Sequence, residues 1–186
     1  NLIIREAEKK ISTHLENITV LYDSSEICSV DICIKKKLDQ MANFNENILS
    51  MILEANNLIN KHYQNKKIIH LIIKKYIIND KEFFNIPDEM PKLDSLILEI
   101  KLILLPYSKY KNVIEIFNKN NLKVLNFFSS SLVKSFQYIE LFQETKFVAF
   151  LDIGLDRSTL IFFNNKKIDF LNNIPIGGNH ISKDIS

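Results

Sequence analysis

The stretch 147-FVAFLDIGLDRSTLIFFNNKKIDFLNNIPIGGNHISKDIS-186 holds all 3 glycines of this 186-residue chain. Glycine is used where the backbone approaches a ligand closely or takes a positive φ, so the unusual backbone is predicted in this one region. Asp152 ends an apolar run and precedes Gly154 by two residues, and a second apolar run follows from Leu160 to Phe163. The pattern predicts a hairpin whose tip can hold a phosphate.

The same stretch predicts three short strands followed by a helix. The strands are expected at residues 147–151, 159–163 and 167–171, with Asn164-Asn165 as the tight turn between the last two. Gly177-Gly178 then precedes a helix that begins near Ile181. The structural alternatives are ordinary: Asp152 as a turn former, the glycine pair as a strand–helix junction, and His180 as a capping-region residue.

Upstream, strands alternate with helices, which indicates a mixed α/β protein. Residues 18–22 and 27–34 are expected to form a hairpin through the turn at 23–25, closed by lysines 35–37. Asn45 is expected to cap the helix that runs to about residue 63. The other expected segments are a helix ending near 15, strands at 68–78, 96–105 and 122–128, a loop at 80–94, and helices at 109–120 and from 129–131 to 143.

Composition argues against several classes of function. The 24 basic and 22 acidic residues nearly cancel, so no global field favours nucleic acid or an anionic membrane. A KH-type RNA module needs a Gly-x-x-Gly loop, and no glycine precedes Gly154. His14, His62 and His70 lack ligand spacing, and no apolar run reaches the roughly 18 uncharged residues of a membrane span. We expect a cytosolic, reduced protein and, because the chain begins at Asn1, a piece of a longer one.

Two motifs carry a family resemblance. Asp152-Ile153-Gly154 in a strand–turn–strand, followed by 174-IPIGGNHISKDI-185, resembles the second phosphate loop and next helix of the actin-like ATPases, and within them is most similar to the FtsA family of bacterial cell-division proteins. Residues 68–70 and 76–78 resemble the strand after that family's inserted helix. Residues 112–128 resemble its helix, turn and return strand, and Ser129-Ser130-Ser131 its small-residue helix start.

The resemblance implies a fragment of the actin-like ATPase fold with an inserted α+β subdomain of the FtsA type. Residues 1–16 and 122–147 would belong to the core of the first lobe, residues 17–121 to the inserted subdomain, and residues 148–186 to the start of the second lobe. The first phosphate loop and the adenosine-binding elements would lie outside this chain.

The resemblance also implies a nucleotide site. ATP and Mg²⁺ are the implied cofactors, with Asp152 holding the metal through water and Gly154 allowing close approach of the backbone. The family then has small residues followed by Thr or Ser, whereas this chain has Leu155, Asp156 and Arg157, with Ser158 one residue late. The implied nucleotide-binding residues are Asp152, Gly154, Leu155, Asp156, Arg157, Ser158, Gly177 and Gly178. No catalytic side chain is implied, and the activity expected is at most that of a weak ATPase.

The function implied is that of an ATP-binding filament former that links the FtsZ ring to the membrane. Its partners would be further copies of itself and FtsZ with other division proteins, at the cytoplasmic face of the membrane at the division site. The membrane would be reached only through a segment outside this chain. Two alternatives stay open: an adaptor of the same fold that has lost ATP binding, and another actin-like ATPase such as a PilM-type pilus-assembly protein. Edges of the apolar strands at 68–78 and 96–105 are candidate filament contacts.

Overall fold

The computed structural model describes residues 2–38, 43–89, 91–92, 94–142 and 144–185. Mixed α/β architecture is confirmed, with strands and helices alternating along the chain. The elements are α1 (Leu2–Ile11), β1 (Asn17–Tyr22), β2 (Cys28–Lys37), α2 (Phe44–His62), β3 (Lys66–Ile78), β4 (Lys81–Phe83), β5 (Ser95–Pro106), α3 (Tyr107–Asn118), β6 (Lys123–Ser129), α4 (Ser130–Ile139), β7 (Phe147–Ile153), β8 (Ser158–Asn164), β9 (Lys167–Ile174) and α5 (Gly178–Ile185).

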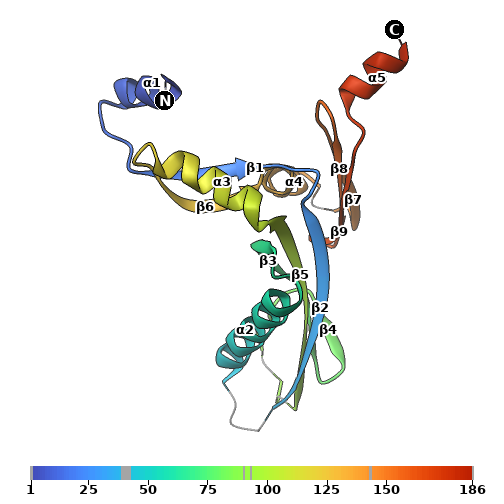
Figure 1. Cartoon of the computed structure of the whole chain (residues 1–186). Coiled ribbons are helices and arrows are strands. Elements are labelled where there is room, and N and C mark those ends of the chain that lie inside the picture. The colour runs from blue at the N-terminus through green and yellow to red at the C-terminus, as the bar shows by residue number, and fades with distance from the viewer. Residues whose placement is uncertain (1, 39–42, 90, 93, 143, 186) are drawn as a thin grey trace.

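The strands of the described residues form three separate sheets. β1 and β6 pair in parallel, β2-β5-β3-β4 make a four-stranded antiparallel sheet, and β7-β8-β9 make a three-stranded antiparallel sheet. In Figure 1 the four-stranded sheet and α2 form the lower body, with α1, α3 and the β1–β6 pair above it. The β7–β9 sheet and α5 stand beside the β1–β6 pair, and α4 lies between them.

Local sequence explains how the four-stranded sheet is covered. α2 presents Met51, Ala55 and Ile59 to the sheet, one turn apart on one face, and all three are buried. Its N-cap is Asn43, whose side chain accepts a hydrogen bond from the backbone N–H of Asn45, so the expected cap at Asn45 is wrong by two residues. β5 lies between β2 and β3; one of its faces is apolar and buried from Leu96 to Leu104, whereas the other carries Glu99 and Lys101 among apolar residues.

The expected hairpin of residues 18–22 and 27–34 is wrong. β1 pairs with β6 and β2 pairs with β5, so the two strands belong to different sheets. Lysines 35–37 do not close a hairpin but form the end of β2, opposite residues 95–97 of β5. Alternation of apolar residues predicts a strand but does not identify its partner, which here is supplied by segments far along the chain.

Smaller differences concern boundaries and turns. β4 lies inside the expected loop at 80–94, and α4 ends at Ile139 rather than near residue 143, which lies outside the described residues. The β8–β9 turn is made by Asn165 and Lys166, with φ of 48° and 59°, one residue later than expected. This is the pattern of a two-residue turn with both central residues left-handed. α5 begins at Gly178 rather than near Ile181.

Two hydrophobic clusters form the core. One joins β1, β6, α4 and the β8–β9 hairpin, and the other fills the space between α2 and the four-stranded sheet. β5 contributes to both, because Ile103 and Leu105 belong to the first cluster and Leu102 and Leu104 to the second. The expected division into subdomains stays a prediction, although β1, placed there with the inserted subdomain, shares its sheet with β6.

Candidate nucleotide-binding site

The turn between β7 and β8 is docked against the start of α5. The backbone N–H of Gly154 donates to the carbonyl of Arg157 at 2.8 Å and closes the turn. The N–H groups of Gly178 and Asn179 donate to the carbonyls of Gly154 and Leu155, at 2.9 and 2.8 Å. The first N–H groups of a helix have no partner inside it, so the turn supplies the partners that α5 needs.

Gly177 is required by this docking. A Cβ at position 177 would lie 2.5 Å from three backbone atoms, the nitrogen of Arg157 and the carbonyl oxygens of Gly154 and Leu155. None of the glycines has a positive φ, so that part of the expectation is wrong. Close approach is the reason for glycine at position 177, and the approach is to the chain's own turn.

Side chains strengthen the same unit. Asn179 Nδ2 donates to the carboxylate of Asp156 at 3.1 Å, and Ser158 Oγ donates to the carbonyl of Ile176 at 2.7 Å. His180 accepts from the N–H of Gly177 through Nδ1 at 3.2 Å, as a capping residue does. Among the described residues, the N–H groups of Leu155 and Asp156 have no acceptor. The turn therefore keeps two backbone donors that an anion can use.

Asp152 lies at the end of β7, where it faces α4. Its Oδ2 accepts from Ser131 Oγ at 2.8 Å and lies 3.4 Å from Lys134 Nζ. Its side chain is 24% exposed. Among the described residues, no hydrogen bond or ion pair is formed with its Oδ1, so this oxygen keeps its capacity to accept. A carboxylate held on one oxygen and open on the other fits the expected role of orienting waters around Mg²⁺.

A second carboxylate, Asp23, lies on the other side of Ser131. It accepts from Ser129 Oγ at 3.1 Å, from Ser131 N at 3.1 Å and from Ser131 Oγ at 2.9 Å, and also from Ser130 Oγ. Arg157 forms an ion pair with it at 3.8 Å. Asp23 thus accepts from the serine-rich start of α4, whose N-cap is Ser129, and its ion pair with Arg157 joins that start to the β7–β8 turn. Sequence reasoning treated Asp23 only as a turn residue and missed this role.

His70 joins the four-stranded sheet to the same helix start. Its Nε2 accepts from the backbone N–H of Ser129 at 2.8 Å, and its ring stacks on Phe128 with 5.3 Å between centroids. Burial lowers the pKa of His70 to about 4, because the charged imidazolium is poorly solvated there. The neutral ring is also the form that can accept this hydrogen bond.

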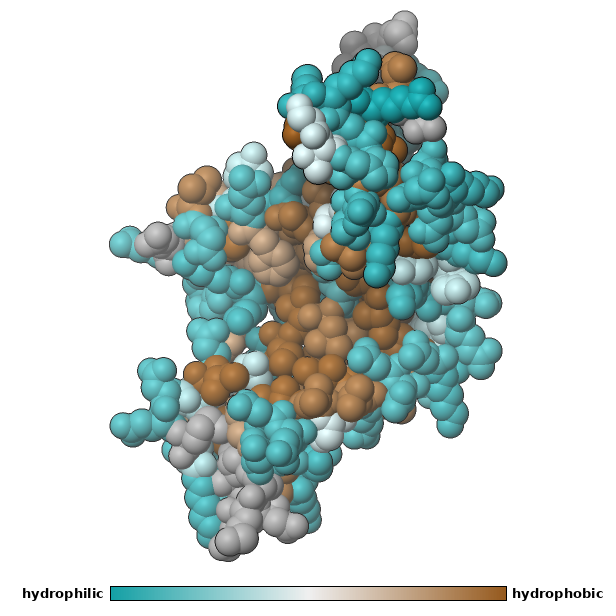
Figure 2. Space-filling model, turned by 90° about the vertical axis from the view of Figure 1, so that its left-hand side faces the viewer, coloured by the Kyte–Doolittle hydropathy of each residue, from teal (hydrophilic) through white to brown (hydrophobic). Residues whose placement is uncertain are grey.

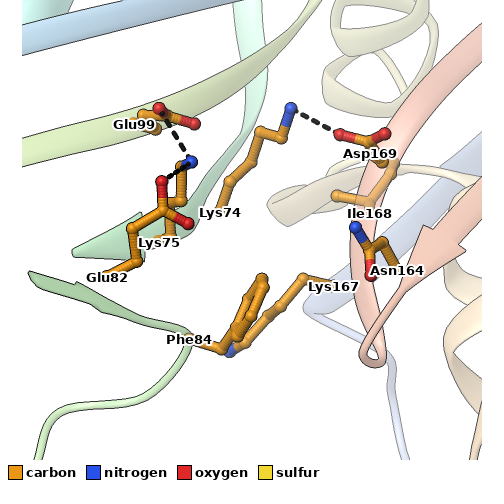
Figure 3. A pocket seen from close by; sticks show the side chains of 9 residues that line it. All are labelled: Lys74, Lys75, Glu82, Phe84, Glu99, Asn164, Lys167, Ile168 and Asp169. Carbon is orange, nitrogen blue, oxygen red and sulfur yellow. Dashed lines mark hydrogen bonds and ion pairs between the residues drawn. The ribbon is translucent and has the colours of Figure 1, made fainter. Parts of the chain in front are cut away.

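A polar cleft of about 130 Å³ lies away from Asp152, between the four-stranded sheet and the β8–β9 hairpin (Figure 3). Lys74 pairs with Asp169 at 2.8 Å across the two sheets, whereas Lys75 pairs within the four-stranded sheet, with Glu82 at 2.8 Å and Glu99 at 3.3 Å. With Lys167, the lining carries three basic and three acidic side chains, so it has little net charge to attract a ligand.

Comparisons with known proteins identify the fold. The chain is similar to the solved structure of a PilM-PilN type IV pilus biogenesis complex, with a TM-score of 0.67 and 12% identity over 99% of this chain and 50% of that one. The chain has the actin-like ATPase fold. It thus spans about half the length of this actin-like neighbour. No family model and no curated protein matches the sequence.

A second actin-like structure is more distant. It is a protein from Bacteroides thetaiotaomicron VPI-5482, described as having an actin-like ATPase fold and unknown function, with a TM-score of 0.36 and 11% identity over 93% of this chain and 52% of that one. The likeness to the first structure confirms the expected fold, whereas the narrower likeness to FtsA is not supported by these comparisons. Among the described residues of this actin-like chain, every helix is too short or too polar to span a bilayer.

All but one of the site residues predicted from sequence lie together in the β7–β8 turn and the start of α5, and the exception is Asp152. The structure brings together Gly154, Leu155, Asp156, Arg157, Ser158, Gly177 and Gly178 in the turn and the start of α5. Asp152 lies at the base of that turn and contacts α4 instead of α5. Asp23 and Ser131 lie beside this candidate site. The run of three serines at 129–131 pointed to Ser131, whereas no sequence signal distinguished Asp23 from an ordinary turn residue.

Proposed function

We propose that this chain is half of an actin-like assembly protein that binds Mg-ATP at the Asp152 site and uses the nucleotide to control assembly with partner proteins. The observation that carries the proposal is the open Oδ1 of Asp152, below a turn with free N–H groups at Leu155 and Asp156. The residues fit Mg²⁺ held through water beside phosphate oxygens.

Each residue of the site has a distinct part in this proposal. Asp152 orients waters of the metal, and the N–H groups of Leu155 and Asp156 donate to phosphate oxygens. Bound Mg²⁺ supplies positive charge that offsets the phosphates. The carboxylate of Asp156 would repel them, but Asn179 already donates to it at 3.1 Å. Leu155 adds a side chain, 71% exposed, where the family has a small residue, so we propose at most weak hydrolysis.

The likeness over 99% of the chain to a pilus biogenesis complex favours a PilM-type assembly protein over a division protein. A FtsA-like filament former that binds FtsZ is the second form of the same proposal. Either form places the protein at the cytoplasmic face of a membrane, reached through a segment outside this chain or through a partner. Both forms need the same nucleotide site.

Calorimetry of Mg-ATP binding by the whole protein tests the proposal. We expect saturable binding that Asp152→Ala abolishes. Asp169→Ala is the matched control, because it removes another carboxylate of the same sheet, one that pairs with Lys74 instead of facing α4. Binding retained in the control and lost in Asp152→Ala supports the proposal. A folded protein that binds no nucleotide supports the adaptor interpretation instead.

The adaptor interpretation has its own structural support in β3. Among the described residues, β3 pairs with β5 along its length, whereas β4 covers only Tyr76 to Ile78 on the other side. Residues 66–75 therefore present a free strand edge. Figure 2 shows apolar side chains gathered on this side of the molecule, between the levels of α3 and α2. Such an edge can pair with a strand of another chain.

Sedimentation velocity over a range of protein concentrations, with and without Mg-ATP, distinguishes the two interpretations. Assembly that is independent of nucleotide supports edge pairing by an adaptor. Assembly that requires Mg-ATP supports the nucleotide-controlled protein. A species that stays monomeric at every concentration argues against self-pairing through β3.

A further inference from the structure

The segment that joins β1 to the four-stranded sheet is tied down at both ends. Asp23, at its start, accepts four hydrogen bonds from Ser129, Ser130 and Ser131. At its end, the carbonyl of Ile27 accepts from Asn173 Nδ2 of β9 at 2.7 Å. Inside it, the N–H of Ile27 donates to the carbonyl of Ser24 at 3.1 Å. The segment is therefore a defined link between the nucleotide-site elements and the four-stranded sheet.

Ser131 lies at the centre of this arrangement. Its Oγ is 2.9 Å from Asp23 Oδ2, 2.8 Å from Asp152 Oδ2 and 3.4 Å from Thr159 Oγ1, and the residue is 2% exposed. A serine hydroxyl carries a single proton, so it donates to only one of the two carboxylates at a time. A ligand that binds Asp152 therefore changes the fraction of the time in which Ser131 donates to Asp23.

A second chain of hydrogen bonds, called the second branch below, runs from Thr159 through Asn173 to Ile27 at the other end of the same segment. Thr159 Oγ1 donates to Asn173 Oδ1 at 2.7 Å, and Asn173 Nδ2 donates to the carbonyl of Ile27. Both halves of the Asn173 amide are thus used, which fixes the orientation of the side chain. Thr159 is 3% exposed, so this branch is shielded from water.

The strand that carries Asn173 also holds the four-stranded sheet directly. Ser29 Oγ of β2 donates to the carbonyl of Leu171 at 3.1 Å, and Lys74 of β3 pairs with Asp169 at 2.8 Å, as Figure 3 shows. β9 belongs to the same sheet as β7 and β8, whose turn is the phosphate-loop candidate. A shift of that sheet therefore acts on β2 and β3 as well as on Ile27.

We infer that Ser131 and Asn173 are positioning residues that couple the state of Asp152 to the four-stranded sheet through residues 23–27. When Asp152 is engaged by a ligand or replaced by a neutral residue, Ser131 donates fully to Asp23 and the segment is held more tightly. When Asp152 is a free carboxylate, it competes for that proton and the segment is held less tightly. The inference holds for any ligand that occupies Asp152, and it does not require that ligand to be ATP.

Hydrogen exchange of the Ile27 amide tests the coupling, because this N–H is bonded within the segment itself. We expect Asp152→Asn to slow Ile27 exchange several-fold in the otherwise unchanged protein and to have no effect in a Ser131→Ala background. Glu115→Gln, which neutralises an exposed carboxylate of α3 that pairs with Lys111, is the control in both backgrounds and is expected to leave Ile27 unchanged. An effect of Asp152→Asn that is absent, or equal in the two backgrounds, overturns the inference.

Asn173→Ala tests the second branch and serves in place of Ser131→Ala if that variant does not fold. It is expected to speed Ile27 exchange about fivefold, the factor for one lost hydrogen bond. The matched control is Asn172→Ala, which removes an exposed side chain that accepts from the backbone N–H of Asn173 at 2.9 Å but, among the described residues, forms no hydrogen bond with residues 23–27. Equal exchange in the two asparagine variants overturns the branch. None of these measurements uses nucleotide, so a negative calorimetry result and a failed coupling test are separate outcomes.

Discussion

Replacing Gly177 with alanine is expected to separate α5 from the β7–β8 turn. The added Cβ would lie 2.5 Å from Arg157 N, Gly154 O and Leu155 O, and these are backbone atoms that cannot rotate away. The helix start must therefore move, which breaks the bonds from Gly178 and Asn179 to the turn. Each of the two lost bonds costs about 1 kcal/mol and the steric strain about 1 to 3 kcal/mol, so we expect destabilisation of about 3 to 5 kcal/mol.

Gly178→Ala is the matched control for this substitution. Its Cβ would lie 3.8 Å from Gly154 O, an ordinary contact, and neither glycine has a positive φ that alanine would have to strain. Alanine also favours a helix over glycine by about 0.5 to 1 kcal/mol. The two substitutions are therefore expected to shift stability in opposite directions, although they add the same methyl group to adjacent residues.

Urea denaturation followed by far-ultraviolet circular dichroism measures the difference, since the chain has no tryptophan to report by fluorescence. Hydrogen exchange of the Gly178 and Asn179 amides shows whether the loss is local to the helix start. Equal denaturation midpoints for Gly177→Ala and Gly178→Ala would refute the reasoning, because close packing of the turn against α5 would then carry no energy.

Two other predictions concern buried ionisable groups. The pKa of His70 falls from 6.5 to about 4 on folding. The contribution of His70 to the free energy of unfolding is therefore constant above pH 6.5 and declines by up to about 3 kcal/mol as the pH falls from 6.5 to 4. Urea denaturation at several pH values should show this decline in the unchanged protein and not in His70→Gln. Asp31→Asn should lower the free energy of unfolding in urea by about 1 to 3 kcal/mol, because it leaves Lys101, which is 2% exposed, without its partner at 2.9 Å. Lys101→Met should restore stability in the Asp31→Asn background, and failure to do so would contradict the explanation.

The glycines illustrate what sequence reasoning could predict. Their clustering located the turn and the helix start, and the structure joins these two segments through Gly177. The reason assigned to them was only partly right, because a glycine needed for close approach to a ligand cannot be told from one needed for close approach to another part of the chain. That distinction depends on where α5 lies, which local pattern does not contain.

Pairing over long sequence distances accounts for what was missed. Asp23 follows a strand and precedes two serines, which is also the composition of an ordinary turn. Its partners at residues 129–131 become neighbours only because β1 pairs with β6. The strands themselves were predicted well, since apolar alternation is local, but Asp23 and Asn173 acquire their roles from the topology.

The parallel pairing of β1 with β6 also has a consequence for folding kinetics. Tyr22 is paired with Ser129, so forming this sheet first would require closing a loop of about a hundred residues. Once Cys28 and Leu104 are paired in the four-stranded sheet, the remaining loop is about threefold shorter, which lowers the entropic cost by about 1 kcal/mol. The four-stranded sheet is therefore expected to form early, and the helix start that holds Asp23 and Asp152 is completed only in the last steps of folding.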